Sequence, residues 1–242
     1  MKVLDKFPDK PRRARKVPTP DTISPEELKA GCHAFQQTER RDAIYKTASF
    51  LVKHFWGKPT EVAEGLGVLL CVWNNAFYRL GPFDYDLLEQ CIARNRAVLD
   101  AFRHRNILTH SPDDDRQMRP LFQEFLDALQ ICEGKCKGRR SPVGVAKALH
   151  LLAPGFFPLW DERIAKAYDC TYDDDPPGQY MAFFRKTKAI AEALAPQVNV
   201  GGRTFLKLID EYNYASSQRA GFDGDCWTRW PNGSGYKAYR ES

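Results

Sequence analysis

The sequence contains no apolar run near the roughly 18–20 residues that a membrane-spanning helix requires, which argues against a helical membrane protein. Residues 1–16 are basic and contain several prolines but no apolar core, so we expect no signal peptide. The seven cysteines are odd in number and spread over a mid-sized chain, which argues against a secreted disulfide framework. We therefore expect a cytoplasmic protein that does not interact with membranes.

Several familiar catalytic and metal-binding patterns are also missing. The chain has no phosphate-binding loop, dinucleotide fingerprint or nucleophile elbow. Cys132 and Cys136 are four residues apart, but no second pair of cysteine or histidine follows at zinc spacing. The aspartate triplets at 113–115 and 173–175 lack the glycine and distal glutamate of a calcium loop. We therefore expect no metal and no other cofactor.

What the chain does contain is the composition of an ordinary folded protein. It has 242 residues, of which 43% are hydrophobic and 28% are charged. Apolar residues recur at helical spacing, and no stretch shows the alternation typical of β-strands. We therefore predict an all-α protein with a basic, flexible arm at 1–20 and a single helical domain at 21–242, and we expect a monomer.

The helix boundaries follow from capping residues and from proline and glycine. Ser24, Pro25 and Glu27 form the pattern of a capping box at the start of the first helix. Further helices are predicted at 40–56, 61–79, 84–99, 118–131, 143–152, 161–168, 179–195 and 202–218. The 61–79 segment is apolar on nearly every side, so we expect it to be central. The tail from 221 is aromatic and rich in glycine, without clear periodicity.

The positive charge is concentrated at the N-terminus. Residues 1–20 hold seven basic and two acidic residues, a net charge of +5, so the remaining 222 residues are net neutral. Two interpretations are open, an electrostatic tether for nucleic acid and a solubilising tail. We favour DNA, because the basic residues are dense between two prolines; those expected to contact the DNA backbone are Arg12, Arg13, Arg15 and Lys16.

The most informative segment spans residues 134–168. It begins with a short basic connector that contains two glycines and the four cations Lys135, Lys137, Arg139 and Arg140. A short apolar helix with one lysine, Lys147, follows. A loop of proline, glycine and aromatic residues then brings Asp161 to the start of another helix. A basic turn at a helix N-terminus can hold a phosphate through backbone N–H groups and the helix dipole.

This arrangement resembles the helix-hairpin-helix DNA glycosylase superfamily, in which a hairpin grips the DNA backbone and an aspartate at a helix start points into the base pocket. The resemblance implies that Gly144 ends the hairpin and that Asp161 is the catalytic aspartate. It extends weakly to the 61–79 segment, which ends in polar residues. The residues that it implies for the base pocket are Trp160, Asn74, Asn75, Tyr78 and Trp73.

The chain departs from the family pattern in three ways. The strict Leu-Pro-Gly-Val-Gly hairpin is replaced by Ser141-Pro142-Val143-Gly144. Lys147 lies 14 residues before Asp161, about one helical turn short of the position of the Schiff-base lysine in bifunctional members. The iron–sulfur cysteine spacing of some members is also missing. The resemblance therefore implies a monofunctional enzyme in which Lys147 holds or tunes Asp161.

The expected chemistry needs one fixed carboxylate above all. Breaking a nucleobase–sugar bond builds positive charge on the deoxyribose, which an aspartate can stabilise while it orients the attacking water. The base must first leave the stack, so its pocket needs aromatic faces and amide groups. The divergent features are similar to those of anti-phage members that excise hypermodified, glucosylated cytosines from phage DNA, which would give the chain a role in antiviral defence. Repair of alkylated or oxidised bases is the alternative within the class.

Each of these residues also has a structural interpretation. Asp161 is a good N-cap, and Lys147 can be a half-buried lysine paired with a carboxylate. Asn74 and Asn75 can simply end a helix, and His150 can be a core histidine with its hydrogen bonds satisfied. On that interpretation the chain is a non-catalytic helical DNA-binding protein, or a helical interaction protein whose basic arm binds RNA, a membrane surface or an acidic partner.

Overall fold

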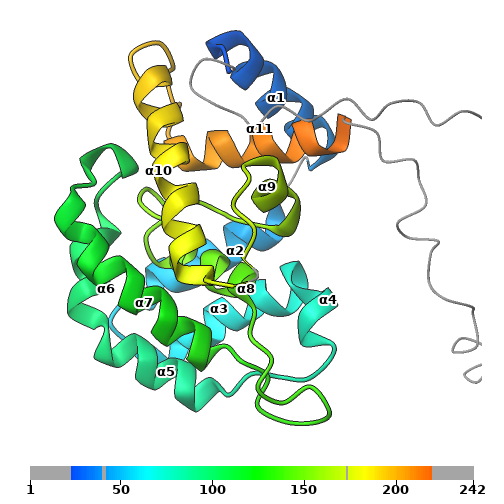
Figure 1. Cartoon of the computed structure of the whole chain (residues 1–242), viewed down its shortest axis with the longest axis vertical. Coiled ribbons are helices and arrows are strands. Elements are labelled where there is room, and N and C mark those ends of the chain that lie inside the picture. The colour runs from blue at the N-terminus through cyan, green and yellow to red at the C-terminus, as the bar shows by residue number, and fades with distance from the viewer. Residues whose placement is uncertain (1–22, 40–41, 173, 220–242) are drawn as a thin grey trace, which may run out of the picture.

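A computed structural model of the chain describes residues 23–39, 42–172 and 174–219 (Figure 1). This part of the chain is helical and contains no β-strand; one isolated bridge joins Phe83 and Ile131. The prediction of an all-α protein is confirmed there, whereas the basic arm and the tail from 221 lie outside the described residues. The elements are α1 (Pro25–Thr38), α2 (Ala43–His54), α3 (Pro59–Trp73), α4 (Asn75–Tyr78), α5 (Tyr85–Arg94), α6 (Arg96–Arg103), η2 (Ile107–Thr109), η3 (Pro112–Asp114), α7 (Asp115–Ala128), α8 (Pro142–Leu152), α9 (Glu162–Ala167), α10 (Pro176–Leu194) and α11 (Phe205–Arg219).

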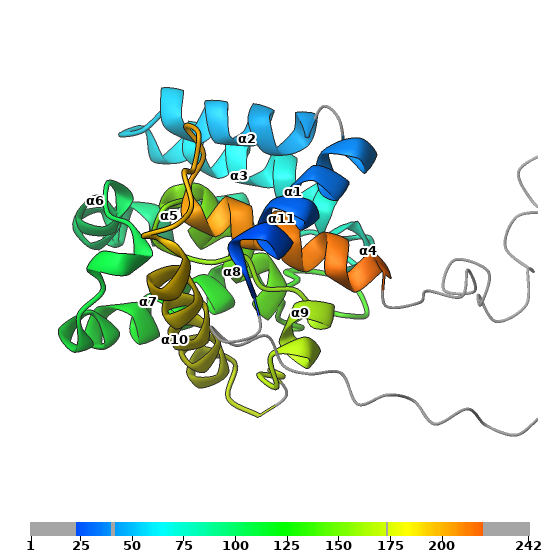
Figure 2. The same ribbon diagram turned by 90° about the horizontal axis from the view of Figure 1, so that it is seen from above.

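The two ends of the described chain meet, because α1 packs along α11 (Figure 2). Helices α2 and α3 form an antiparallel pair, and α8 packs beneath them and against α7. Every side chain of α8 except those of Pro142, Val143 and Lys147 is buried. The central helix of the fold is therefore α8. The expectation for 61–79 is only partly correct, since Val68 and Val72 of α3 are 39% and 51% exposed.

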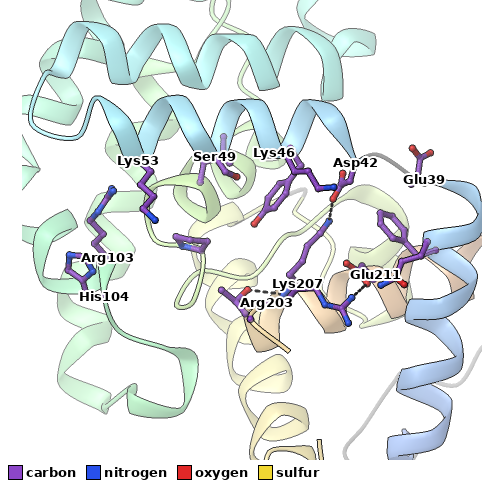
Figure 3. Close-up of a pocket in the computed structure, with 17 residues that line it drawn as sticks. Glu39, Asp42, Lys46, Ser49, Lys53, Arg103, His104, Arg203, Lys207 and Glu211 are labelled. Carbon is purple, nitrogen blue, oxygen red and sulfur yellow. Dashed lines mark hydrogen bonds and ion pairs between the residues drawn. The ribbon is translucent and has the colours of Figure 1, made fainter. Parts of the chain in front are cut away.

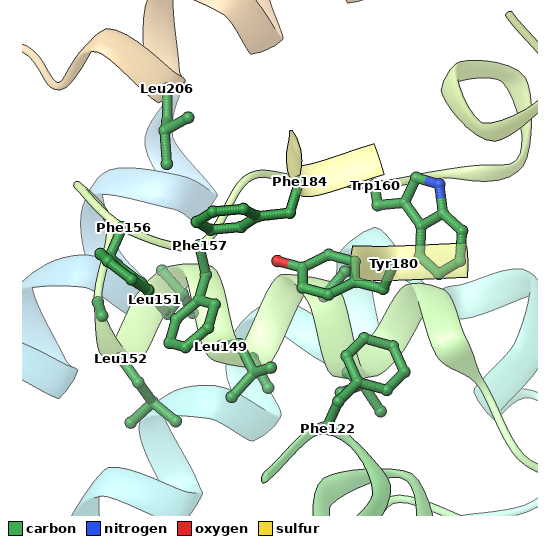
Figure 4. Packing of buried hydrophobic residues seen from close by; sticks show 14 of the residues in the cluster. Phe122, Leu149, Leu151, Leu152, Phe156, Phe157, Trp160, Tyr180, Phe184 and Leu206 are labelled. Atoms are coloured by element: carbon green, nitrogen blue, oxygen red, sulfur yellow. The ribbon is translucent and has the colours of Figure 1, made fainter. Parts of the chain in front are cut away.

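The loop between α8 and α9 is fixed by aromatic packing (Figure 4). Phe156 stacks on Phe102, with ring centroids 4.5 Å apart, and Trp160 packs against Tyr180. The Tyr180 hydroxyl donates a 2.9 Å hydrogen bond to the carbonyl oxygen of Pro158. Full burial of each such ring contributes about 1.5–3 kcal/mol, so this loop is a rigid part of the core. The rigid loop therefore fixes the position of Asp161, which follows Trp160.

Several predicted boundaries are confirmed and others are wrong. The capping box of Ser24 and Glu27 is present, and Asp84 caps α5 through the backbone N–H groups of residues 86 and 87. The predicted 84–99 helix is two helices, because the chain breaks at Asn95. The predicted 61–79 helix begins at Pro59 and ends at Trp73, and α4 follows as a separate turn. None of the helices in the described ranges combines the length and apolarity needed to cross a membrane.

Candidate functional site

The basic connector forms a tight hairpin just before α8. The Ile131 N–H donates to the Arg139 carbonyl oxygen at 2.9 Å, and the Gly138 N–H donates to the Ile131 carbonyl oxygen at 2.8 Å. Gly134 and Gly138 have φ of 77° and 84°, a region that favours glycine. The four cations of this basic hairpin are exposed, and Arg140 pairs with Asp127 at 2.6 Å. They are Lys135, Lys137, Arg139 and Arg140.

The basic hairpin leads directly into the start of α8. Ser141 is the N-cap, and its hydroxyl oxygen accepts from the Gly144 N–H at 3.0 Å and from the Asn74 side-chain amide at 2.8 Å. A Cβ atom at Gly144 would lie 2.9 Å from the Tyr78 hydroxyl. A side chain at 144 would therefore have to displace the Tyr78 hydroxyl, which gives this glycine a packing role whatever further role the helix N-terminus has.

Four of the predicted site residues line one cavity of about 340 Å³, here called the aspartate pocket. These four are Trp73, Lys147, Trp160 and Asp161. They come from the end of α3, the middle of α8 and the loop before α9. The other lining residues are Phe35, Glu39, Asp42, Leu159, Ile164, Lys207, Asp210 and Tyr214. The structure therefore brings together both residues to which the sequence assigns catalysis.

Asp161 is a helix cap and a pocket residue at once. Its Oδ1 accepts a 2.7 Å hydrogen bond from the Ile164 N–H, which closes the first turn of α9. Its Oδ2 accepts no hydrogen bond from any residue that the structure describes, and the side chain is half-buried. One carboxylate oxygen thus orients the group while the other remains available to a ligand.

Lys147 is held by backbone and not by a carboxylate. Its Nζ donates a 2.6 Å hydrogen bond to the carbonyl oxygen of Trp73, and it forms no ion pair within the described ranges. Burial lowers the pKa of Lys147 to about 8, against the opposing attraction of Asp161 and Asp210. The interaction of Lys147 with Asp161 is therefore electrostatic and acts through space, without a direct contact.

The remaining predicted base-pocket residues lie outside the lining of the aspartate pocket. Asn74 caps the C-terminus of α3 and bonds to Ser141, as described above. Asn75 is exposed and donates to the Cys71 carbonyl oxygen at 3.5 Å. Tyr78 is buried, and its hydroxyl donates to the Leu129 carbonyl oxygen at 3.1 Å. Asn74 and Tyr78 are therefore already bonded to the protein, and Asn75 faces solvent near the basic hairpin.

Sequence reasoning missed an ionic cluster that also lines the aspartate pocket. Lys207 Nζ lies 3.1 Å from Asp42 Oδ2 and 3.4 Å from Asp210 Oδ2. It also lies 4.5 Å from the Tyr45 ring centroid and 4.8 Å from that of Phe35. Burial alone would lower the pKa of Lys207, but attraction to Asp210 and Asp42 outweighs it and raises the pKa. Burial raises the pKa of Asp210 to about 6, although Lys207 opposes this shift.

A sequence signal for part of this cluster does exist. Lys207 and Asp210 lie three residues apart and interrupt the apolar run Leu206, Leu208 and Ile209, so a buried charged pair could have been suspected. No local pattern places Asp42 beside them. Asp42 has φ of 44° and makes no cap with its side chain, because the carboxylate bonds to Lys207 instead. Left-handed backbone in a residue other than glycine is strained, which is typical of functional sites.

His150 supports the pocket from behind and is a core histidine. It is fully buried, with Nδ1 2.8 Å from the Phe157 carbonyl oxygen and Nε2 3.0 Å from the Tyr45 hydroxyl. The carbonyl can only accept, so Nδ1 carries the proton and Nε2 accepts from Tyr45. Burial lowers the pKa of His150 to about 4. Tyr45 in turn stacks on Trp73 at 5.7 Å, which fixes one wall of the aspartate pocket.

A second, larger cavity adjoins the aspartate pocket (Figure 3). It measures about 660 Å³ and is here called the lysine pocket. The two cavities share four lining residues, Phe35, Glu39, Asp42 and Lys207. Within the described ranges, no group of three or more histidine, cysteine or acidic side chains is placed to hold a metal ion. Comparison with known proteins gives no match to this chain, whether among protein-family models, curated proteins or solved structures.

Proposed function

We propose that the chain is a monofunctional DNA glycosylase that flips a modified base out of DNA and hydrolyses its N-glycosidic bond, leaving an abasic site. One observation carries the proposal. Asp161 and Lys147 line a single cavity with an aromatic wall, and α8 connects that cavity directly to an exposed basic hairpin. A carboxylate, a cation, aromatic faces and a phosphate-binding element are the parts that base excision requires.

In this mechanism Asp161 carries the chemistry. Its Oδ2, which accepts no hydrogen bond from the described residues, stabilises the positive charge that develops on the deoxyribose and orients a water molecule. The hydrogen bond from the Ile164 N–H keeps the carboxylate in place during the reaction. The Lys147 ammonium group supplies positive charge on the side where the departing base becomes negative. Lys147 remains tied to the Trp73 carbonyl oxygen throughout and does not attack the sugar.

The pocket and its surroundings account for binding. A cavity of about 340 Å³ holds a single flipped base, and Trp73 provides a flat face beside it. The basic hairpin and the N-terminal arm contact the DNA backbone, and the dipole of α8 adds to this attraction at the helix start that follows the hairpin. We extend the proposal to hypermodified cytosine as the substrate and to antiviral defence as the role, on the strength of the family resemblance.

The second candidate function is a non-catalytic helical DNA-binding protein. The observation that favours it is the Ile164 N–H to Asp161 Oδ1 hydrogen bond, since an N-cap alone is a sufficient reason for an aspartate at this position. The basic hairpin and the arm would serve this function equally well. The two candidates differ in whether DNA is changed after it is bound.

The test is to incubate the protein with genomic DNAs that differ in base modification and to measure alkali-labile abasic sites. We expect one modified DNA to accumulate such sites with the wild type and not with Asp161→Asn. Glu162→Gln is the matched control, because Glu162 is the exposed neighbouring carboxylate on α9 and, among the residues that the structure describes, pairs only with Lys166. DNA binding without abasic sites on any DNA would favour the non-catalytic candidate.

A further inference from the structure

We propose that the base taken by this site carries a negatively charged substituent, a carboxylate or a phosphoryl group, that ends in the lysine pocket. This inference rests on the proposed glycosylase function and adds a statement about the substrate. It comes from the cavity that the proposed function leaves unused, which has about twice the volume of the aspartate pocket, 660 Å³ against 340 Å³.

The order of the two cavities follows from α8. The helix begins at the basic hairpin with its N-cap Ser141, and Lys147 in the aspartate pocket lies six residues on, roughly 9 Å along the axis. Leu151 lines the lysine pocket four residues later, roughly 6 Å further. The lysine pocket thus lies beyond the aspartate pocket as seen from the basic hairpin. DNA held at the basic hairpin would present a flipped base first to Asp161 and then, at its far edge, to the lysine pocket.

The two cavities meet at the residues that line both of them. The Asp42–Lys207 ion pair stands at the boundary and lines both of them. Figure 3 shows this pair crossing between the start of α2 and α11. A group attached to a base in the aspartate pocket would therefore reach the lysine pocket beside the Asp42–Lys207 pair.

The charges of the lysine pocket favour an anion. Two of its three carboxylates are paired with cations, Glu211 with Arg203 at 2.7 Å and Asp42 with Lys207, which also pairs with Asp210. The third, Glu39, lies at the opposite end of the pocket from Lys53 and Arg103, and Lys46 lies near Asp42 between these ends (Figure 3). Lys46 and Lys53 lie along one face of α2, and Arg103 lies at the end of α6.

Lys46, Lys53 and Arg103 join no ion pair with any residue that the structure describes. Lys46 and Lys53 make no hydrogen bond or ion pair within the described ranges. The Arg103 guanidinium lies 3.6 Å from the Trp56 ring centroid and joins no ion pair there either. Three cations that line one cavity suit an acceptor-only group, which a carboxylate or phosphoryl group supplies.

The experiment compares duplex oligonucleotides that carry one cytosine with an aminoallyl linker at C5. The linker is acylated either with succinate, which ends in a carboxylate, or with acetate, which is neutral. Binding is followed by fluorescence anisotropy, and abasic sites are scored separately on the same DNAs. We expect the succinylated duplex to bind about tenfold more tightly than the acetylated one. The Lys46→Gln/Lys53→Gln double variant should lose that preference, whereas Arg116→Gln, at an exposed position near the start of α7, should keep it.

The outcomes separate this inference from the proposed function. Equal binding of the two DNAs, or a preference that survives in the double variant, would overturn the inference even if abasic sites form. If the succinylated duplex is preferred through Lys46 and Lys53 but no DNA acquires abasic sites, the lysine pocket is an anion site. The proposed glycosylase function would then be overturned. Inorganic phosphate should compete only with the succinylated duplex. If phosphate binds through the two lysines but the two DNAs bind equally well, the lysine pocket binds a free anion. That result would overturn the proposal that the base carries a charged substituent.

Discussion

The side-chain nitrogen of Lys147 lies 2.6 Å from the carbonyl oxygen of Trp73, 74 positions earlier in the chain. Trp73 is the last residue of α3, so its carbonyl is one of those that the helix leaves without an internal partner. It also lies at the negative end of the helix dipole, which favours a cation. Lys147 therefore supplies a hydrogen-bond donor for a free carbonyl at the end of α3, and it places an ammonium group in the aspartate pocket.

The Asp161→Asn variant should keep its fold and lose base excision. Asparagine accepts the hydrogen bond from the Ile164 N–H about as well as aspartate, so α9 remains capped. Removal of one preorganised charge costs about 2–4 kcal/mol in the transition state, or about 30- to 1,000-fold in rate. Single-turnover release of base from a susceptible DNA measures the loss. Normal release by this variant would remove Asp161 from the mechanism.

Lys147 should form no covalent adduct with DNA. A lyase needs a neutral amine within reach of C1′, and the amine of Lys147 is bonded to Trp73. Borohydride should therefore trap no protein–DNA complex, and strand cleavage should require added alkali. The pKa of about 8 supplies a sharper check, because any amine-dependent cleavage would rise almost tenfold between pH 6 and pH 7. An adduct that Lys147→Ala abolishes would identify a lyase.

The sequence was sufficient for the fold class and for part of the site. Capping residues and apolar periodicity are local, so Ser24 and Asp84 correctly mark helix starts. The break at Asn95 was not predicted, because it depends on a long-range contact. There the Asn95 amide donates to Glu124 on α7 at 2.8 Å, besides its bond to the Cys91 carbonyl oxygen. Such a contact leaves no trace in local periodicity.

The difference between local patterns and long-range contacts also explains which residues of the candidate site the sequence predicted and which it missed. Asp161 and Lys147 are close in sequence and lie on consecutive elements, so a local motif could pair them. Lys207 and Asp42 come from opposite ends of the chain and meet only because α1 and α2 pack near α11. Asn74 has the residue type of a base-binding amide, but tertiary structure uses it to bond Ser141. Residue type alone could not show that this amide was already engaged.

DNA binding should weaken and lose salt dependence when the basic segments are altered. Deletion of residues 1–20 removes a net charge of +5, and no residue there was predicted to be core, so stability should hardly change. Each lost phosphate contact lowers the salt slope by about 0.9, so the slope should flatten by several units. Lys135→Gln/Lys137→Gln should give a smaller flattening. Titrations of a duplex at several salt concentrations measure both, and an unchanged slope would show that the altered residues do not touch DNA.

His150 should make the protein sensitive to acid. Its pKa falls from an ordinary value of 6.5 to about 4 on folding, so the folded state disfavours the protonated form. The resulting stability is fully present above pH 6.5 and is lost as pH falls toward 4, by about 3 kcal/mol in all. His150→Asn should be less stable at pH 7, because Tyr45 and Phe157 lose a partner, but its stability should fall less with acid. Urea unfolding at pH 7, 5.5 and 4.5 tests this, with exposed His104→Asn as the control. The same fall in both variants would contradict it.

The contribution of Asp210 to stability should depend on pH in the opposite sense to that of His150. Its pKa is raised from 3.8 to about 6 on folding, mainly by burial, so the folded state favours the protonated carboxyl group. That stabilisation is present at low pH and is lost as pH rises from about 4 to about 6, which leaves the ionised carboxylate unfavourable at neutral pH. Asp210→Asn is neutral throughout and leaves Lys207 paired with Asp42 at 3.1 Å.

The stability of Asp210→Asn relative to wild type should therefore increase by about 1–3 kcal/mol between pH 4.5 and pH 7.5. The loss of the 3.4 Å contact with Lys207 offsets part of the gain, so the change with pH is the quantity to measure and not the value at one pH. Urea unfolding at both pH values supplies it, with Asp86→Asn on the exposed side of α5 as the control. A relative stability that stays constant, or that falls as pH rises, would show that Asp210 is ionised in the folded state even at low pH and that its pairing with Lys207 outweighs its burial.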